Sequence, residues 1–383
     1  MSATIAAPAL APEAPELAEV DRVSVATQWQ LVWWRFRKHR LAVISAGVLT
    51  VFYLVVVFAD FLAYADPLAS EAQRGLIAPQ PIRLFDSSGF SPSVEALVGT
   101  RDQQTFKRVY VVDPSQKVSV HLFAHGYEYR LFGLIPSDLH LIGVEGEGKS
   151  AENSLFLLGT DVQGRDLWSR LMYATQISML IGLSSVAISL FLGVLLGGLA
   201  GYFGGLADTF VMRLVEILRS IPTIPLWMGV GAALPKEWDI IKVFFVMTIL
   251  FALIQWTELA RVVRGRFLSL REEDFVMAAE LAGCSRLRII FRHMVPSFLS
   301  HIIAATTLAL PAIIIFETSL SFLGLGLRPP AISWGVMLQQ ASNVQTLAIS
   351  PWLLIPAAPV IIAILAFNFL GDGLRDAADP YGS

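Results

Sequence analysis

Residues 171–207 read LMYATQISMLIGLSSVAISLFLGVLLGGLAGYFGGLA, and no charged residue interrupts them. A helix needs about 20 consecutive apolar residues to cross the hydrocarbon core of a bilayer, so this stretch is long enough to span a membrane. The whole chain has the same character, because 55% of its 383 residues are apolar, only 15% are charged and its mean hydropathy is +0.62. Soluble domains carry about 25% charged residues. The sequence therefore predicts an all-α polytopic membrane protein.

Five further apolar stretches bring the predicted number of transmembrane helices to six. They cover Leu41–Ala59, Met212–Leu234, Ile240–Ala260, Phe298–Leu320 and Trp352–Leu370. Leu41–Ala59 lies in the first transmembrane segment, residues 41–64. The second to sixth predicted helices lie in a core of residues 171–383. Three charges at i, i+3 spacing fall in the third predicted span: Arg213, Glu216 and Arg219. We interpret them first as an intrahelical ion-pair ladder at the membrane interface.

The distribution of cations predicts which side of the membrane each loop occupies. Residues 33–40, WWRFRKHR, combine an aromatic pair with four cations before the first span, and seven arginines lie in residues 261–296. The connection at residues 320–351 holds only Arg328. Because cytoplasmic loops carry an excess of Lys and Arg, we predict that the N- and C-termini are cytoplasmic in a bacterial inner membrane. Residues 1–40 are then a cytosolic tail, and their Ala/Pro-rich start lacks the basic flank of a cleavable signal.

Residues 65–170 separate the first two predicted spans and are expected outside the membrane. Their middle alternates in the manner of strands at residues 108–112, 117–122 and 127–131, and residues 113–115 and 125–126 are expected to be turns. We predict a small β-rich periplasmic insertion here. His121 and His125 suggest a nickel site, but histidines in an exposed strand-rich loop are more often solvated surface, and we predict no metal site.

Residues 143–150, GVEGEGKS, match the phosphate-loop pattern G-x-x-x-x-G-K-[ST]. Two carboxylates lie within the loop and would repel phosphate, and a polar stretch follows where a helix is needed. The predicted topology also places Lys149 outside the membrane, away from cytosolic ATP. We therefore predict that this motif binds no nucleotide.

The cytosolic loop 261–296 is the predicted functional element. Ser269 and Glu272 form a capping-box pattern at the start of a short helix, and Gly283 is suited to a left-handed stop. Ser285 can start a second short helix that runs to Pro296. Small residues at Ala278 and Ala279 permit close approach by another protein. By themselves these residues fit an interfacial amphipathic helix equally well.

The spacing of Ala278, Ala279, Gly283 and Pro296 resembles the EAA loop of ABC importer membrane subunits, which docks into a cleft on a cytosolic ATPase. Met277 and Val295 stand where that loop has glutamate and leucine. Four further segments resemble the C-type membrane subunits of the dipeptide/oligopeptide/nickel importers, as does the lead-in to the first span. They are residues 158–171 (LGTDVQGRDLWSRL), 317–326 (ETSLSFLGLG), 333–335 (SWG) and 370–380 (LGDGLRDAADP). The resemblance covers residues 29–381.

The resemblance implies a type I ABC importer permease fold and a function in translocating peptides or solutes of similar size. Implied partners are a second, homologous permease subunit, two cytosolic ATPases that carry ATP and Mg²⁺, and a periplasmic solute-binding protein, in a lipid bilayer. No cofactor and no catalytic residue is expected on this chain, and the net charge of −3 argues against a nucleic-acid partner. An oligosaccharide or opine-like conjugate, or nickel, remains an alternative cargo. A stand-alone secondary transporter and a membrane-embedded enzyme are the alternative classes.

Glu317 is the second candidate site residue. It is the only Asp, Glu, Lys or Arg between Arg292 and Arg328, and it falls near the outer end of the fifth predicted span. An acid at membrane depth is a candidate for the solute pathway or its gate. A structural acid that caps backbone amides at the helix exit is an equally good interpretation.

Overall fold

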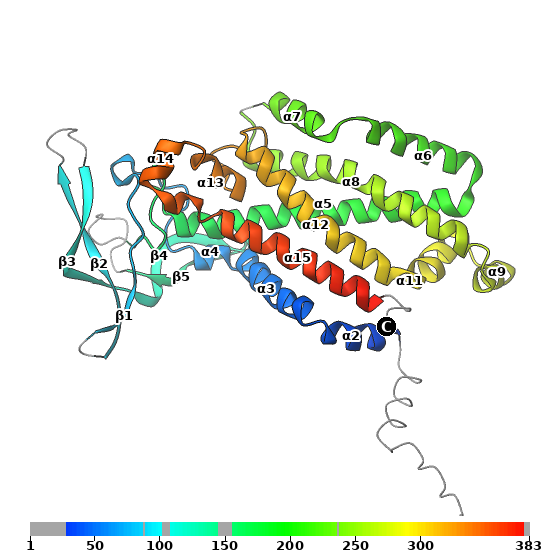
Figure 1. The fold of residues 1–383 in the computed structure, drawn as a ribbon, viewed down its shortest axis with the longest axis horizontal. Helices are drawn as coiled ribbons and strands as arrows, with labels where there is room; N and C mark the ends of the chain where they lie inside the picture. The colour runs from blue at the N-terminus through cyan, green and yellow to red at the C-terminus, as the bar shows by residue number, and fades with distance from the viewer. Residues whose placement is uncertain (1–27, 87–88, 102–107, 145–154, 236, 379–383) are drawn as a thin grey trace, which may run out of the picture.

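The computed structural model describes residues 28–86, 89–101, 108–144, 155–235 and 237–378 (Figure 1). Long helices run side by side, with the β-strands at one end and α9 (Asp274–Leu281) at the other. The start of the N-terminal tail, most of the phosphate-loop pattern with Lys149 and the last two residues of the 370–380 segment lie outside the described residues. Shorter helices complete the description: α2 (Gln28–Lys38), α4 (Ala59–Leu62), η1 (Ala72–Arg74), α13 (Trp334–Gln340), α14 (Val344–Ile349) and η4 (Pro351–Leu354).

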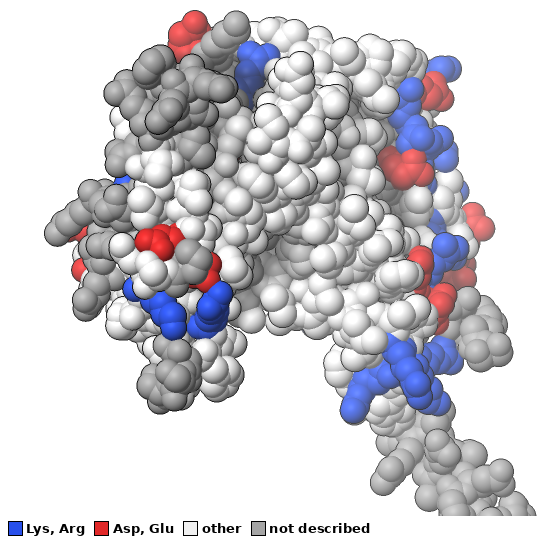
Figure 2. Space-filling view, turned by 60° about the vertical axis from the view of Figure 1, so that its left-hand side comes forward, with Lys and Arg blue, Asp and Glu red and all other residues white. Residues whose placement is uncertain are grey.

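Five helices of the described chain are long and apolar enough to cross a membrane. They are α3 (Arg40–Val57), α5 (Leu167–Phe203), α8 (Ile240–Leu270), α12 (Leu299–Phe322) and α15 (Ala357–Ala378). Figure 2 shows a broad surface without charged side chains, with charged side chains gathered on either side of it. With 37 residues and 31 residues, α5 and α8 rise about 55 and 46 Å, which exceeds a hydrocarbon core of about 30 Å. Both helices therefore extend beyond the bilayer.

Glycines let the two longest helices approach closely. A Cβ atom added at Gly197 would lie 2.5 Å from the carbonyl oxygen of Ala260, and one at Gly201 would lie 2.8 Å from that of Arg264. Small residues at such positions are how membrane helices pack without a hydrophobic driving force. Larger residues at either position would push α8 away from α5.

The third predicted span is not one helix, and this prediction was wrong. In place of Met212–Leu234 the chain forms α6 (Gly205–Ser220) and α7 (Thr223–Ala233). Pro222 breaks the run because its ring removes an amide donor and biases the preceding residue, Ile221, away from helical angles; Ile221 has φ −82° and ψ 124°. With 11 residues, α7 rises only about 17 Å. It is therefore too short to span the bilayer alone.

The predicted β-rich insertion is confirmed between α4 and α5, as two antiparallel sheets. One sheet has the order β1 (Arg83–Asp86), β2 (Gly89–Arg101), β3 (Arg108–Ser119), and the other pairs β4 (His121–Leu131) with β5 (Ile135–Gly143). The two predicted turns, residues 113–115 and 125–126, are instead irregularities within strands. The pairing register of β3 with β2 shifts at residues 113–117, and that of β4 with β5 shifts at residues 125–129. In the first, Asp113 Oδ1 accepts a 2.9 Å bond from the Ser115 amide, so turn chemistry is satisfied by a bulge.

The segment before α5 is a buried polar junction that joins distant parts of the chain. Asp161 accepts a 2.7 Å bond from Arg165 Nε, and its Oδ2 lies 3.6 Å from Arg170 Nε. Asp166 caps α5 through the Ser169 amide at 2.7 Å and accepts a 2.8 Å bond from the Tyr64 hydroxyl. Because Tyr64 follows the first span, this junction fixes that exit against the start of α5.

Candidate functional site

The hook, residues 271–297, connects α8 to α12 at the end of the molecule opposite the β-strands (Figure 1). It contains α9, α10 (Arg286–Arg288), the π-helical turn η3 (Ile289–Met294) and α11 (Val295–Ser297). The predicted helix–glycine–helix order is confirmed, with Ser285 at the start of the second helix.

Gly283 ends α9 in the left-handed conformation that the sequence predicts, with φ +75°. The Gly283 amide donates to the Glu280 carbonyl at 2.9 Å and the Cys284 amide to the Ala279 carbonyl at 3.1 Å. This pair of bonds is a Schellman motif. Open space surrounds a Cβ atom built on Gly283, so the backbone angle alone restricts this position.

The predicted capping box does not form. Ser269 lies inside the last turn of α8, which continues to Leu270, and Glu273 occupies the N-cap position of α9 without a side-chain capping bond. The sequence signal was misleading because the fourth span extends about ten residues beyond its apolar part.

The hook rests on the end of the bundle through an apolar cluster. Val276 and Ala279 of α9 are buried against residues of α8 and of the second half of the hook. The cluster also contains Val194, Leu259, Val263, Phe267, Ile289, Ile290, Met294 and Ile302. Tyr202, near the end of α5, adds a 2.6 Å bond to Glu280, and the Arg286 guanidinium lies 5.3 Å from the centre of the Phe203 ring. The hook thus contacts α5, α8 and α12 together.

Ala278 and Ala279 lie on different faces of α9. Ala279 is 8% exposed and packs into the cluster, whereas Ala278 is exposed. Around Ala278 the outward face carries exposed Phe275, Met277 and Leu281, of which Leu281 is 91% exposed. Pro296, the fourth predicted site residue, is exposed at the start of α11. The sequence did not predict the outward apolar residues because α9 is too short for its periodicity to identify a face.

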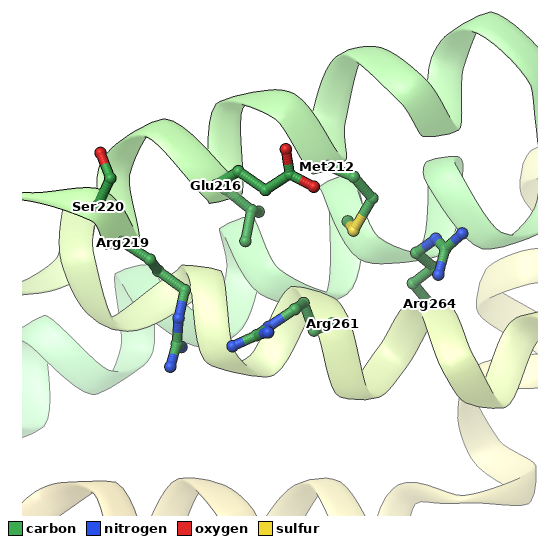
Figure 3. A pocket seen from close by; sticks show the side chains of 7 residues that line it. Met212, Glu216, Arg219, Ser220, Arg261 and Arg264 are labelled. Carbon is green, nitrogen blue, oxygen red and sulfur yellow. The ribbon is translucent and has the colours of Figure 1, made fainter.

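Charged side chains also gather between α6 and α8, where they border a hollow of about 530 Å³ (Figure 3). The residues that line the hollow are Met212, Val215, Glu216, Arg219, Ser220, Arg261 and Arg264. Arg213 pairs with Glu216 at 2.8 Å, as the ladder predicts, but Arg219 reaches Glu258 of α8 instead.

The pair of Asp208 with Arg264 also joins α6 to α8. The Arg264 guanidinium lowers the pKa of the Asp208 carboxyl, so the pair stays charged at neutral pH. These pairs hold the amphipathic α6 against α8.

Glu317 is fully buried where α12, α5 and the segment before α13 meet. The hydroxyls of Ser178 and Ser321 donate to its carboxylate at 3.0 and 2.9 Å. The same two hydroxyls accept the backbone amides of Trp334 at 3.2 Å and Leu327 at 3.1 Å. Glu317 therefore orients serines that cap amides, rather than capping amides itself.

The part of the chain that the structure describes has no group of three or more His, Cys, Asp or Glu side chains placed to hold a metal ion. His125 lies 3.0 Å from Asp138 on the surface of the hairpin.

A bundle of helices long enough to span a membrane carries the β-module (β1–β5) at one end and the hook at the other, which is the architecture of a multi-pass membrane protein. Residues 193–381 match the family described as binding-protein-dependent transport system inner membrane component, and residues 27–79 match the N-terminal TM domain of oligopeptide transport permease C. The chain belongs to this family of inner-membrane permease subunits of ABC importers.

Several curated proteins are similar to this chain. The oligopeptide transport system permease protein OppC of Haemophilus influenzae is 40% identical over 223 residues, 58% of this chain and 69% of that protein. OppC of Escherichia coli K12 is 39% identical and covered over 71% of its length. A putative peptide permease of Brucella suis is 37% identical over 64% of this chain and 78% of its own.

Among solved structures, a chain of the MetNI methionine ABC transporter in an inward-facing conformation matches 54% of this chain and 95% of its own length. Its TM-score is 0.40 and its sequence identity 17%.

Proposed function

We propose that this chain translocates oligopeptides across the inner membrane as one half of a heterodimeric pathway. Its partners would be a second homologous permease subunit, two cytosolic ATPases that bind ATP and Mg²⁺, and a periplasmic solute-binding protein. The oligopeptide cargo rests on the names of the similar permeases. ATP hydrolysis is assigned to the partners, and this chain is proposed to have no catalytic role.

The observation that carries the proposal is the outward face of α9. Exposed Phe275, Met277 and Leu281 surround the small Ala278, and the other side of the helix is buried in the chain's own core. An exposed apolar patch of this kind marks a contact surface. Because the inner side is rigidly packed, a displacement of α9 by an ATPase would move the ends of α5, α8 and α12 together. A nucleotide-dependent contact here would then bias the whole permease between two states.

The proposed orientation puts the hook and both termini in the cytoplasm. Basic α2 packs beside the C-terminal end of α15, where Phe36 of α2 and Ala377 of α15 share a cluster with Ala42 of α3, so the cations before the first span lie at that end of the bundle. The residues Cys284 and Lys149 would then be on opposite sides, and Lys149 would have no access to cytosolic ATP. An impermeant thiol reagent is expected to label Cys284 in inside-out vesicles and not in spheroplasts. Labelling in spheroplasts would reject this orientation.

For Glu317 we propose a structural role, since its carboxylate is enclosed by hydroxyl donors and fully buried. A residue of the solute pathway would need contact with water or cargo in some state of the transporter. The Glu317→Gln experiment below separates the two roles.

The function is tested by affinity purification of the tagged chain from its host membranes, followed by uptake assays in cells that lack it. We expect ATPase and second permease subunits to co-purify, and uptake of labelled oligopeptides to require the chain. Uptake of nickel or an oligosaccharide, but not of peptides, would reject the proposed cargo. Transport by the purified chain alone would reject the assembly.

A further inference from the structure

The β4–β5 hairpin ends in a tip that is apolar throughout. Residues 131–135 read LFGLI, and in this tip Phe132 is 58% and Leu134 81% exposed. Ile135 is exposed as well, and Arg130 precedes the tip as an exposed cation. An isolated exposed leucine is ordinary, but a contiguous apolar loop tip next to a membrane-spanning helix marks a contact surface.

The turn at this tip has an unfavourable residue at its most restrictive position. Phe132 and Gly133 both have positive φ, +55° and +71°, and the Leu134 amide donates to the Leu131 carbonyl at 3.1 Å. That is the pattern of a type I′ turn, whose first central position favours Asn, Asp or Gly. A bulky aromatic residue with positive φ is a true outlier. Such an outlier is reason to look for a function of the side chain.

The hairpin is held along the exit of the first span. Phe132 lies 6.4 Å from Phe58, ring centre to ring centre, and Phe123 lies 6.3 Å from Phe61. Phe58 directly follows α3, and Phe61 comes later as the chain leaves the membrane. The tip is therefore the end of the hairpin nearer to the membrane.

A polar contact on the same hairpin fixes this arrangement. The Tyr127 hydroxyl lies 3.3 Å from that of Tyr173 in α5, and Tyr173 donates to the Asp60 carboxylate in α4. The hairpin is thus bonded to α5, and through Tyr173 it is linked to α4.

The tip continues an apolar surface of α3. Exposed Ile44, Val51, Leu54 and Val57 lie on that helix, where lipid covers them in a spanning segment, and exposed Phe58 directly follows it. The backbone of the tip also suits a medium of low polarity, because the amides of Gly133 and Leu134 are both bonded within the turn. Backbone groups in lipid must be satisfied internally.

We propose that the tip of the β4–β5 hairpin inserts into the outer leaflet, with Phe132, Leu134 and Ile135 among the lipid chains and Arg130 at the level of the phosphates. A long cationic side chain at that depth reaches the headgroups. The leaflet named here rests on the orientation proposed above, whereas contact of the tip with lipid does not. The insertion anchors the β-module at a fixed height over the permease.

Two single-cysteine variants test the proposal in the full complex, reconstituted in lipid nanodiscs, with Cys284→Ser as background. Leu134→Cys places an environment-sensitive fluorophore on the tip, and Val111→Cys places it on an exposed site of β3. We expect lipids with a shallow spin label to quench only the first, and iodide to quench it roughly ten-fold less than the second, because ions are excluded from lipid. Equal quenching of both by iodide would overturn the proposal. Protection of the tip from both quenchers would also overturn it, in favour of a protein partner.

A third variant removes the apolar wedge and keeps the turn. Phe132→Asn creates Asn-Gly, the favoured type I′ pair, so the hairpin is expected to fold as before. Combined with Ile135→Ser, it should abolish lipid quenching at position 134 and leave the melting temperature of the complex unchanged. Lipid quenching that persists in this variant would contradict the assigned anchor. The same two substitutions, made in the chain that keeps Cys284 and Leu134, are expected to leave the Cys284 labelling pattern unchanged, so failure of the proposed orientation remains distinguishable.

Discussion

The Tyr202 hydroxyl, near the end of α5, donates a 2.6 Å hydrogen bond to the Glu280 carboxylate of α9. The two residues are 78 positions apart in the chain. This bond is a direct polar link between a membrane-spanning helix and the hook, on the side of the hook that faces the bundle.

Tyr202→Phe should weaken coupling without releasing the ATPases. An exposed hydrogen bond of this type contributes about 1 kcal/mol, which is a factor of about five in an equilibrium. We expect peptide uptake per ATP hydrolysed to fall several-fold in proteoliposomes. Tyr129→Phe is the control, because it removes a bond of the same length, 2.6 Å to the Leu139 carbonyl, in the β-module. An equal effect of both changes would mean that the link has no special role.

Gly283→Val should uncouple transport from hydrolysis. A side chain in the left-handed region costs about 1–2 kcal/mol, and more when it is β-branched. The spans do not depend on this turn, so the protein should accumulate normally while ATPase retention and uptake fall. Gly283→Asn is the matched control, since asparagine tolerates positive φ and no atom lies within 4 Å of the added Cβ. Normal transport by the valine variant would remove the hook from the coupling mechanism.

Ala278→Leu and Ala279→Leu should fail in different ways. The first adds bulk to an exposed face, so the melting temperature should stay within error while co-purification of the ATPases is lost. The second overfills a packed cluster, at a cost of about 1–3 kcal/mol, and should lower the melting temperature of the chain in detergent. If both variants only lower stability, α9 is not a docking face.

Glu317→Gln should destabilise the chain while the ATPases stay bound. The glutamine side chain has one acceptor oxygen for two serine hydroxyls, so one hydroxyl faces the NH₂ group, which is a donor, and loses its hydrogen bond. The loss lowers the free energy of unfolding by about 1–3 kcal/mol. Thermal unfolding in detergent measures this, with the exposed Glu216→Gln as a control expected to change little. Unchanged stability together with lost transport would instead support a role in the pathway.

Asp166 should give the chain a measurable pH dependence of stability. Burial raises the pKa of its carboxyl to about 6, above an ordinary value of about 3.9. The folded state therefore binds this proton more tightly, so its contribution is fully present below the ordinary pKa and is lost as the pH rises through about 6. The full effect is about 3 kcal/mol.

The comparison with Asp166→Asn isolates that contribution. Between pH 7.5 and pH 4.5 the melting temperature of the unmodified chain should rise relative to that of the variant, which has no proton to gain. Parallel curves for the two proteins would show that Asp166 does not titrate in this range.

Local sequence was enough to predict five of the six expected spans, the β-rich insertion, the position of the hook and the left-handed turn at Gly283. Each depends on a property that a few neighbouring residues carry: continuous apolarity over a bilayer's thickness, alternation, or a glycine where other residues are strained. The break at Pro222 was also visible in the sequence, but the apolar residues on either side of it masked the signal.

Only the tertiary structure decided which face of each element is buried or exposed and which residues are its partners. It placed Ala278 outward and Ala279 inward, gave Arg219 a partner on α8, joined Glu317 to Ser178 of α5 and set Phe132 beside Phe58. These relations join residues that are far apart in the chain. They depend on which helices pack together, and the apolar composition that makes every span insert is nearly uniform around each helix, so it does not specify the neighbour.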